Sequence, residues 1–308
     1  MSTSNTETAA IEEISLHEGE APPAALEMEW EALQVLDEET EASLLRRWSP
    51  VLHLHPAERF VPTCVDHYLA NSTLGSKASP EEEPVQATWE GVVQKGRDAL
   101  ITPRQEYLAD PASHPPCVHG CARRRPQDGR VVLAFLMFYA DQPDVSVCCH
   151  WRAGGHICDL EWLIFVLSPD GQTLEWAYFT AHGRTESSWV PGASLQWKVV
   201  RKEGEAEGEG AARPVAYVAK TTHALTWSAG WKPRLWFAVI EKTSAAGRVI
   251  DAAEVLSIVK PDHPWWQFPG SMGPDGCGSI GGKGRLNTPA FAGSEWTTAW
   301  RRSLFRTS

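Results

Sequence analysis

The stretch Asp159-Leu160-Glu161-Trp162-Leu163-Ile164-Phe165-Val166-Leu167 places two acidic residues directly before a run of apolar side chains. The apolar run predicts a buried β-strand. Side chains of an extended chain alternate between two faces, so Asp159 and Glu161 are expected on the same face. The two carboxylates would then lie at the mouth of a buried element; the alternative is a polar loop with solvated charges.

A histidine stands three residues before Asp159, directly after the pair Gly154-Gly155. Glycine allows the backbone to turn, which would bring His156 over the same face as the carboxylates. Two carboxylates and an imidazole at one spot repel one another unless a cation or a shared proton lies between them. His156, Asp159 and Glu161 are therefore candidate ligands of a divalent metal cation, with Mg, Ca, Mn, Fe and Zn not distinguished.

Two further histidines end or interrupt strand-like runs, His182 after residues 175–181 and His223 after residues 214–222. A single histidine at a strand end is more often a structural hydrogen-bonding group than a ligand. Beside the motif at 156–161, His182 and His223 become candidate catalytic residues, acting as general acid and base, or further metal ligands.

Short β-like runs recur along the chain between glycine- and proline-containing turns, at 131–140, 160–167, 173–180, 195–201, 214–220, 234–241 and 248–258. This pattern predicts a mainly β protein, a two-sheet antiparallel β-sandwich. Residues 1–25 are expected to be a disordered acidic tail, since they carry no periodic apolar pattern. A helical pattern runs from Leu26 to Trp48, and residues 26–308 are expected to form a single domain.

The order of several segments resembles the vacuolar protein sorting-associated protein sixty-two family of fungi and its plant relatives of unknown function. That family has a P-x-x-x-x-H-P-x-E-x-x-x-P opening, matched by residues 50–62, and an H-E-G-D-W-E core, matched at His156, Asp159 and Glu161. Its later segments are matched by 181–183, 217–224 and 268–274, whereas Ile157-Cys158 and Leu160 depart from its core. The resemblance covers roughly residues 44–300 and implies that the polar positions of the core are kept.

The core motif is also similar to that of the necrosis- and ethylene-inducing peptide-like proteins, which carry G-H-R-H-D-W-E. Gly155, His156, Asp159 and Glu161 match this pattern position by position. In that family the motif binds a divalent cation at one end of a β-sandwich. The resemblance implies the same use here, and the family's attack on plant membranes is not carried over.

Composition excludes several classes of protein. The chain carries a net charge of −11, yet its first 45 residues hold 12 acidic residues and no Lys or Arg, so the remainder is close to neutral. This balance offers no basic patch for nucleic acid, and no apolar run is long enough to span a membrane. Seven cysteines without a disulfide-like spacing and no basic, apolar leader predict a cytoplasmic protein with reduced thiols.

One cysteine-rich stretch, 114–121, interleaves His114, Cys117, His119 and Cys121. Cys-x-x-x-Cys is not a standard zinc spacing, so this stretch is expected to be a proline-rich loop.

Three functions remain open from the sequence. The first is a metal-dependent enzyme acting on a small-molecule or secondary-metabolite substrate. The second is a divalent-cation-dependent binding module for an anionic lipid headgroup or glycan. The third is a metal-free hydrogen-bonded network that fixes strand ends. The oligomeric state and the identity of any small-molecule ligand do not follow from the sequence.

Overall fold

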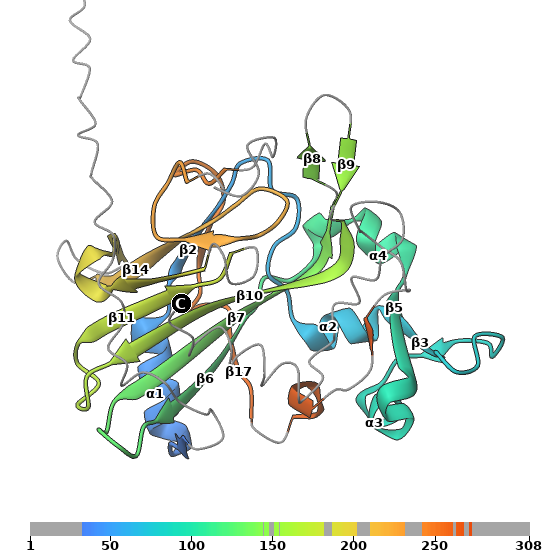
Figure 1. The fold of residues 1–308 in the computed structure, drawn as a ribbon, viewed down its shortest axis with the longest axis horizontal. Helices are drawn as coiled ribbons and strands as arrows, with labels where there is room; N and C mark the ends of the chain where they lie inside the picture. The colour runs from blue at the N-terminus through green and yellow to red at the C-terminus, as the bar shows by residue number, and fades with distance from the viewer. Residues whose placement is uncertain are drawn as a thin grey trace, which may run out of the picture.

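Two long antiparallel strands, β7 (Val131–Gln142) and β10 (His156–Leu167), run side by side through the middle of the protein (Figure 1). Residues 131–140 and 162–167 are buried at every position, which explains why both stretches are apolar at successive rather than alternate positions. The computed structural model describes residues 33–143, 145–147, 151–153, 155–181, 187–201, 210–231, 242–260, 263–267 and 271–272.

Around this pair, the described residues form a seven-stranded sheet in the order β1-β6-β7-β10-β11-β12, with β17 paired to β6. The added strands are β1 (Gln34–Val35), β6 (Val118–Arg124), β11 (Leu174–Phe179), β12 (Ser188–Pro191) and β17 (Leu256–Ile258).

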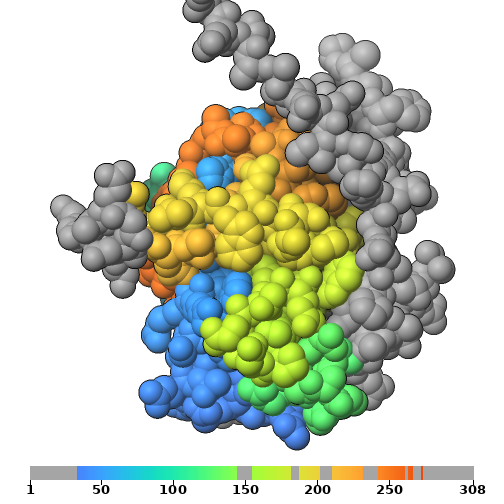
Figure 2. Space-filling view, turned by 90° about the vertical axis from the view of Figure 1, so that its left-hand side faces the viewer, coloured from blue at the N-terminus to red at the C-terminus, as the bar shows by residue number. Residues whose placement is uncertain are grey.

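A five-stranded sheet has the order β13-β14-β2-β16, with β15 also paired to β14. Its strands are β13 (Trp197–Val200), β14 (Ala211–Val218), β2 (Val51–Leu54), β16 (Val249–Asp251) and β15 (Leu225–Thr226). Figure 2 shows residues of this sheet in yellow, lying between the blue N-terminal segment and the orange residues near 250.

Two smaller sheets complete the described strands. One has the order β18-β5-β3-β4 and consists of β18 (Ser271–Met272), β5 (Ala99–Pro103), β3 (Ser72–Ser76) and β4 (Val85–Gln86). The other pairs β8 (Val145–Val147) with β9 (Trp151–Ala153). The helices α2 (Val65–Ala70), α3 (Trp89–Lys95) and α4 (Gln105–Ala109) lie near the four-stranded sheet (Figure 1).

Helix α1 (Glu38–Trp48) packs against β6 and β14. Asp37 caps its first turn, because the carboxylate accepts the Thr40 N–H at 2.8 Å. Its buried acid Glu41 accepts the Ala122 N–H at 2.7 Å and pairs with Arg123 at 3.3 Å. The contact between α1 and β6 therefore includes a buried, paired carboxylate as well as apolar side chains.

The mainly β class is confirmed, but the predicted two-sheet antiparallel sandwich is too simple. The described residues form four sheets, and β14 pairs with β2, β17 with β6 and β18 with β5 in parallel. Such pairings join segments far apart in the sequence, so local alternation does not reveal them.

Within the helical pattern expected from Leu26 to Trp48, Glu38–Trp48 is helix and Gln34–Val35 is a strand, while residues 26–32 lie outside the described residues. The run 248–258 is two strands instead of one, β16 and β17. The tail at 1–25 and the expected strand at 234–241 lie outside the described residues, so the domain boundaries remain predictions. In the part of the chain that is described, no helix is long and apolar enough to cross a membrane.

Candidate functional site

Three segments that are distant in the sequence meet at one end of β10. After β14, the chain makes a tight turn in which the Ala219 N–H donates to the Ala224 carbonyl at 2.9 Å. Two residues of this turn adopt a left-handed backbone conformation, Thr221 with φ 76° and His223 with φ 57°. That backbone directs His223 back over β7 and β10, where its ring lies flat on Tyr139 at 3.8 Å with an interplanar angle of 4°.

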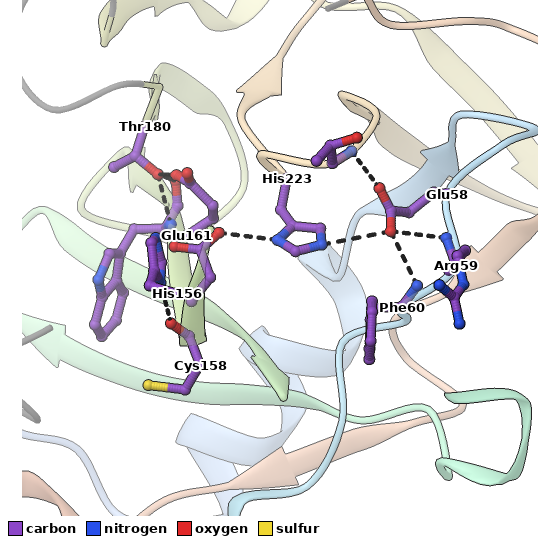
Figure 3. Close-up of polar contacts among 11 residues, drawn as sticks. Glu58, Arg59, Phe60, His156, Cys158, Glu161, Thr180 and His223 are labelled. Carbon is purple, nitrogen blue, oxygen red and sulfur yellow. Dashed lines mark hydrogen bonds and ion pairs between the residues drawn. The ribbon is translucent and has the colours of Figure 1, made fainter. Parts of the chain in front are cut away.

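His223 lies between two carboxylates (Figure 3). Its Nδ1 is 2.9 Å from Oδ2 of Asp159, a hydrogen-bond distance, and its Nε2 is 3.5 Å from Oε1 of Glu58. The second distance is longer than an ordinary N–H···O bond, so that contact is an ion pair. The His223 side chain is fully buried and that of Glu58 is 2% exposed.

Glu58 is held by main-chain donors as well as by the imidazole. Its carboxylate accepts the N–H groups of Arg59 at 2.8 Å, Phe60 at 2.9 Å and Thr221 at 2.5 Å. The Thr221 bond ties the loop after β2 to the turn that carries His223. Glu58 is the acidic position of the motif at 50–62, for which the sequence alone indicated no role.

The electrostatics of this cluster favour a charged imidazole. Burial alone would lower the pKa of His223, but the attraction of Glu58 and the bond with Asp159 outweigh it and raise the pKa to about 10. Burial would raise the pKa values of Asp159 and Glu58; the hydrogen bond and attraction of His223 dominate and lower both. The cluster therefore contains an imidazolium between two carboxylates at neutral pH.

Asp159 and Glu161 occupy the same face of β10, two positions apart, and are 9% and 7% exposed. The Thr180 hydroxyl donates to Glu161, and it accepts the Trp162 N–H at 2.7 Å. Burial raises the pKa of Tyr139 well above its usual range, and Glu58, Glu161 and Asp159 raise it further. All three acidic groups thus act on the one phenol that lies beneath His223.

His156 begins β10 and is half-buried. Its Nδ1 is 2.6 Å from the carbonyl oxygen of Cys158, so that nitrogen carries the proton and donates. His156 also contributes to the electrostatic field at Asp159. Cys158 has a left-handed backbone conformation, with φ 51°. Its side chain is buried, which agrees with a packing role.

The structure therefore brings His223 into contact with Asp159 and places His156 and Glu161 on the same strand. His182 lies outside the described residues. Among the described His, Cys, Asp and Glu side chains, the set whose ligand atoms all lie within 4.8 Å of one another is a different one, Cys64, Cys117 and His119. The stretch 114–121 is not wholly a loop, since β6 begins at Val118.

Comparisons with known proteins give structural neighbours only. No protein-family model and no curated protein matches the chain, so the resemblance to the sorting-associated family gains no support. One solved neighbour is described as a "toxin fold for microbial attack and plant defense", with 12% identity, 75% of this chain and 81% of that chain covered, and a TM-score of 0.31.

A second neighbour is the necrosis and ethylene inducing protein 2 of the causal agent of cocoa's witches' broom disease, at 16% identity, covering 65% of this chain and 74% of that one, with a TM-score of 0.29. A third is NLPPya in complex with mannosamine, at 13% identity, covering 74% and 79%, with a TM-score of 0.31. By name, these include proteins of the second family that the core motif resembles. Similarity at this level assigns neither an activity nor a ligand to the chain.

Proposed function

We propose that the protein is a divalent-cation-dependent binding module, in which a cation held near Asp159 and Glu161 bridges to an anionic headgroup or glycan. The observation that carries the proposal is the charge balance at Tyr139. Among the described residues, the carboxylates of Glu58, Asp159 and Glu161 act on this phenol, and the one buried imidazolium beside them is that of His223. Buried charges are stable when they are paired, and one divalent cation would balance the excess.

His156, Asp159 and Glu161 are the proposed ligands. The Asp159 oxygen Oδ2 accepts the bond from His223 at 2.9 Å, so Oδ1 would be the oxygen that binds a cation. His156 would supply Nε2, because its Nδ1 faces the Cys158 carbonyl at 2.6 Å. Carboxylate and imidazole donors suit Mg²⁺, Mn²⁺, Fe²⁺ or Zn²⁺, while Ca²⁺ needs additional oxygens.

Binding is favoured over catalysis because of the state of His223. A general base needs an unprotonated nitrogen within reach of a substrate. Both ring nitrogens of His223 face carboxylates, and its side chain is fully buried. A metal-dependent enzyme acting on a small-molecule or secondary-metabolite substrate would have to use His182 or a metal-bound water instead. A cytoplasmic location remains a prediction.

The test compares Glu161→Gln with wild type in protein freed of metal by a chelator. Mg²⁺, Mn²⁺, Ca²⁺ and Zn²⁺ are added in turn, and the melting temperature and the heat of binding are measured. Glu161→Gln should weaken metal binding by about 10–100-fold or more, since even residues around metal ligands have effects of that size. Glu175→Gln, on the adjacent strand β11 and paired with Arg130 at 2.6 Å, is the matched control.

The second arm tests the ligand. Wild type should bind anionic phospholipid vesicles or an acidic oligosaccharide only in the presence of the cation that binds wild type more tightly than Glu161→Gln. If wild type and Glu161→Gln have equal melting temperatures both with added metal and with chelator, the cation site is contradicted. Cation binding without cation-dependent ligand binding contradicts the module and favours the enzyme.

A further inference from the structure

A second group of ligand atoms lies away from the carboxylate cluster, where β6 begins beside α2. Cys117 and His119 are two residues apart as the chain enters β6 (Val118–Arg124), so their side chains point to the same face. Cys64 is the residue directly before α2 (Val65–Ala70). Cysteine is a poor helix cap and makes no capping bond here, so helix formation does not account for its presence.

Main-chain bonds hold the two segments together. Thr63 forms an isolated antiparallel bridge with Pro116. The Cys117 N–H donates to the Pro62 carbonyl at 2.8 Å, and the Thr63 hydroxyl donates to the Pro115 carbonyl at 3.0 Å. These bonds fix Cys64 opposite Cys117 independently of what their thiols do.

The ligand atoms of Cys64, Cys117 and His119 all lie within 4.8 Å of one another, and Cys117 Sγ is 3.9 Å from His119 Nε2. A tetrahedral zinc ion with Zn–S near 2.3 Å and Zn–N near 2.0 Å separates sulfur from nitrogen by about 3.5 Å. The observed spacing needs only a small contraction to reach that value.

The imidazole nitrogen nearest the thiols is a hydrogen-bond acceptor in this structure. His119 is 2% exposed and its ring packs edge-on against Trp265 at 4.6 Å. Its Nε2 accepts the Val65 N–H at 3.3 Å. Nε2 is therefore unprotonated, the form that a metal requires, and an ion would take its single lone pair in place of the long bond from Val65.

Asp66 borders the solvent side of the cluster. Its Oδ1 accepts the Trp89 indole N–H at 2.6 Å, and its Oδ2 is 3.9 Å from Cys64 Sγ. Cys64 is half-exposed while Cys117 is buried, so an ion would enter from the Cys64 side. A carboxylate oxygen is a common fourth ligand for zinc.

We propose that Cys64, Cys117 and His119 form a zinc-type metal site, with Asp66 or a water on its solvent side as the fourth ligand. Two thiolates and an imidazole select a borderline-soft ion such as Zn²⁺ over Mg²⁺ or Ca²⁺. The site shares no residue with the carboxylate cluster, and the inference stands without the function proposed above. An ion there would link the start of β6 to the start of α2.

The test is Co²⁺ titration of the reduced, metal-free full chain, since Co²⁺ replaces Zn²⁺ and its thiolate bonds absorb in the near ultraviolet. Wild type should bind one equivalent with thiolate-to-cobalt absorption, and Zn²⁺ should displace it. Cys117→Ser and Cys64→Ser should lose most of that absorption, and His119→Gln should lower affinity by at least about 10–100-fold.

Cys121→Ala is the matched control, because Cys121 is a buried free thiol on the same strand, β6, outside the cluster. It should keep full absorption, and so should Glu161→Gln. Cys64→Ser covers the case in which Cys117→Ser fails to fold, as judged by circular dichroism.

Absence of thiolate absorption in reduced wild type overturns the proposal, as does undiminished absorption in both serine variants. A Cys64–Cys117 disulfide in protein purified without reductant, combined with no cobalt binding after reduction, would assign the two thiols to redox pairing instead.

Discussion

Replacing His223 by alanine should destabilise the protein strongly at neutral pH. The change removes the cation between Asp159 and Glu58, whose side chains are 13% and 2% exposed. Removing one partner of a buried ion pair costs about 3–5 kcal/mol. Loss of the flat contact with Tyr139 adds about 0.5–1.5 kcal/mol, so we expect a total loss of about 3.5–6.5 kcal/mol in the free energy of unfolding.

The free energy of unfolding should also depend on pH through His223. The pKa of His223 is raised from 6.5 to about 10 on folding. Its contribution to stability is therefore fully present below pH 6.5 and is lost as the pH rises to about 10. Wild type should lose up to about 5 kcal/mol over this window, and a variant without the imidazole should lose much less.

Urea unfolding followed by tryptophan fluorescence, at pH 6.5 and pH 9.5, measures both effects. His223→Asn serves if the alanine variant does not fold, since asparagine tolerates a left-handed backbone but carries no charge. His53→Ala is the control, because His53 is half-buried and meets no carboxylate among its described contacts. Equal losses in His223→Ala and His53→Ala, with the same pH dependence as wild type, would refute the imidazolium.

Two further changes probe the surroundings. Thr180→Val should cost about 1–3 kcal/mol, because it leaves a buried main-chain N–H without its acceptor and takes the hydroxyl donor from Glu161; Thr180→Ser should restore most of the loss in urea unfolding. Gly192→Ala should cost about 2 kcal/mol or more, because its new Cβ would lie 1.9 Å from the Leu174 carbonyl oxygen. Gly75→Ala, with 3.9 Å to its nearest neighbour, should cost about 1 kcal/mol or less, and similar midpoints for the two alanine variants would contradict the steric argument.

The central strands could be predicted from the sequence, but their pairing partners could not. The apolar stretches 131–140 and 162–167 predicted β7 and β10, because burial on both faces requires apolar residues at every position. The parallel pairing of β2 with β14 was beyond reach, because nothing local in Val51–Leu54 indicates a partner at 215–218.

The candidate site was predictable only where it depends on local spacing. The spacing of Asp159 and Glu161 gave their common face directly. The placement of His223 depends on a left-handed turn of Thr221 and His223, two residues that seldom adopt this backbone. The proximity of two carboxylates predicted a cation or a shared proton between them, and the buried imidazolium of His223 supplies part of the opposite charge.

The alternation of Cys117 and His119 was a usable signal for the thiol cluster, once that stretch is treated as a strand. No comparable signal pointed to the third member of the cluster, because Cys64 is 53 residues before Cys117 in the sequence. Proline-rich composition at 111–116 favoured a loop and hid the start of β6.

The β2–β14 pairing has a consequence for how the chain is made. Residues 51–54 leave the ribosome early, yet their parallel partner at 215–218 emerges more than 150 residues later. At synthesis rates of about 5–20 residues per second, His223 is made about 3–13 seconds after Asp159 and about 8–33 seconds after Glu58. During that interval the β7–β10 hairpin can form from nearby residues, but one of its faces lacks cover. A nascent chain halted before residue 223 should therefore be a favoured substrate for chaperones that bind exposed apolar strands.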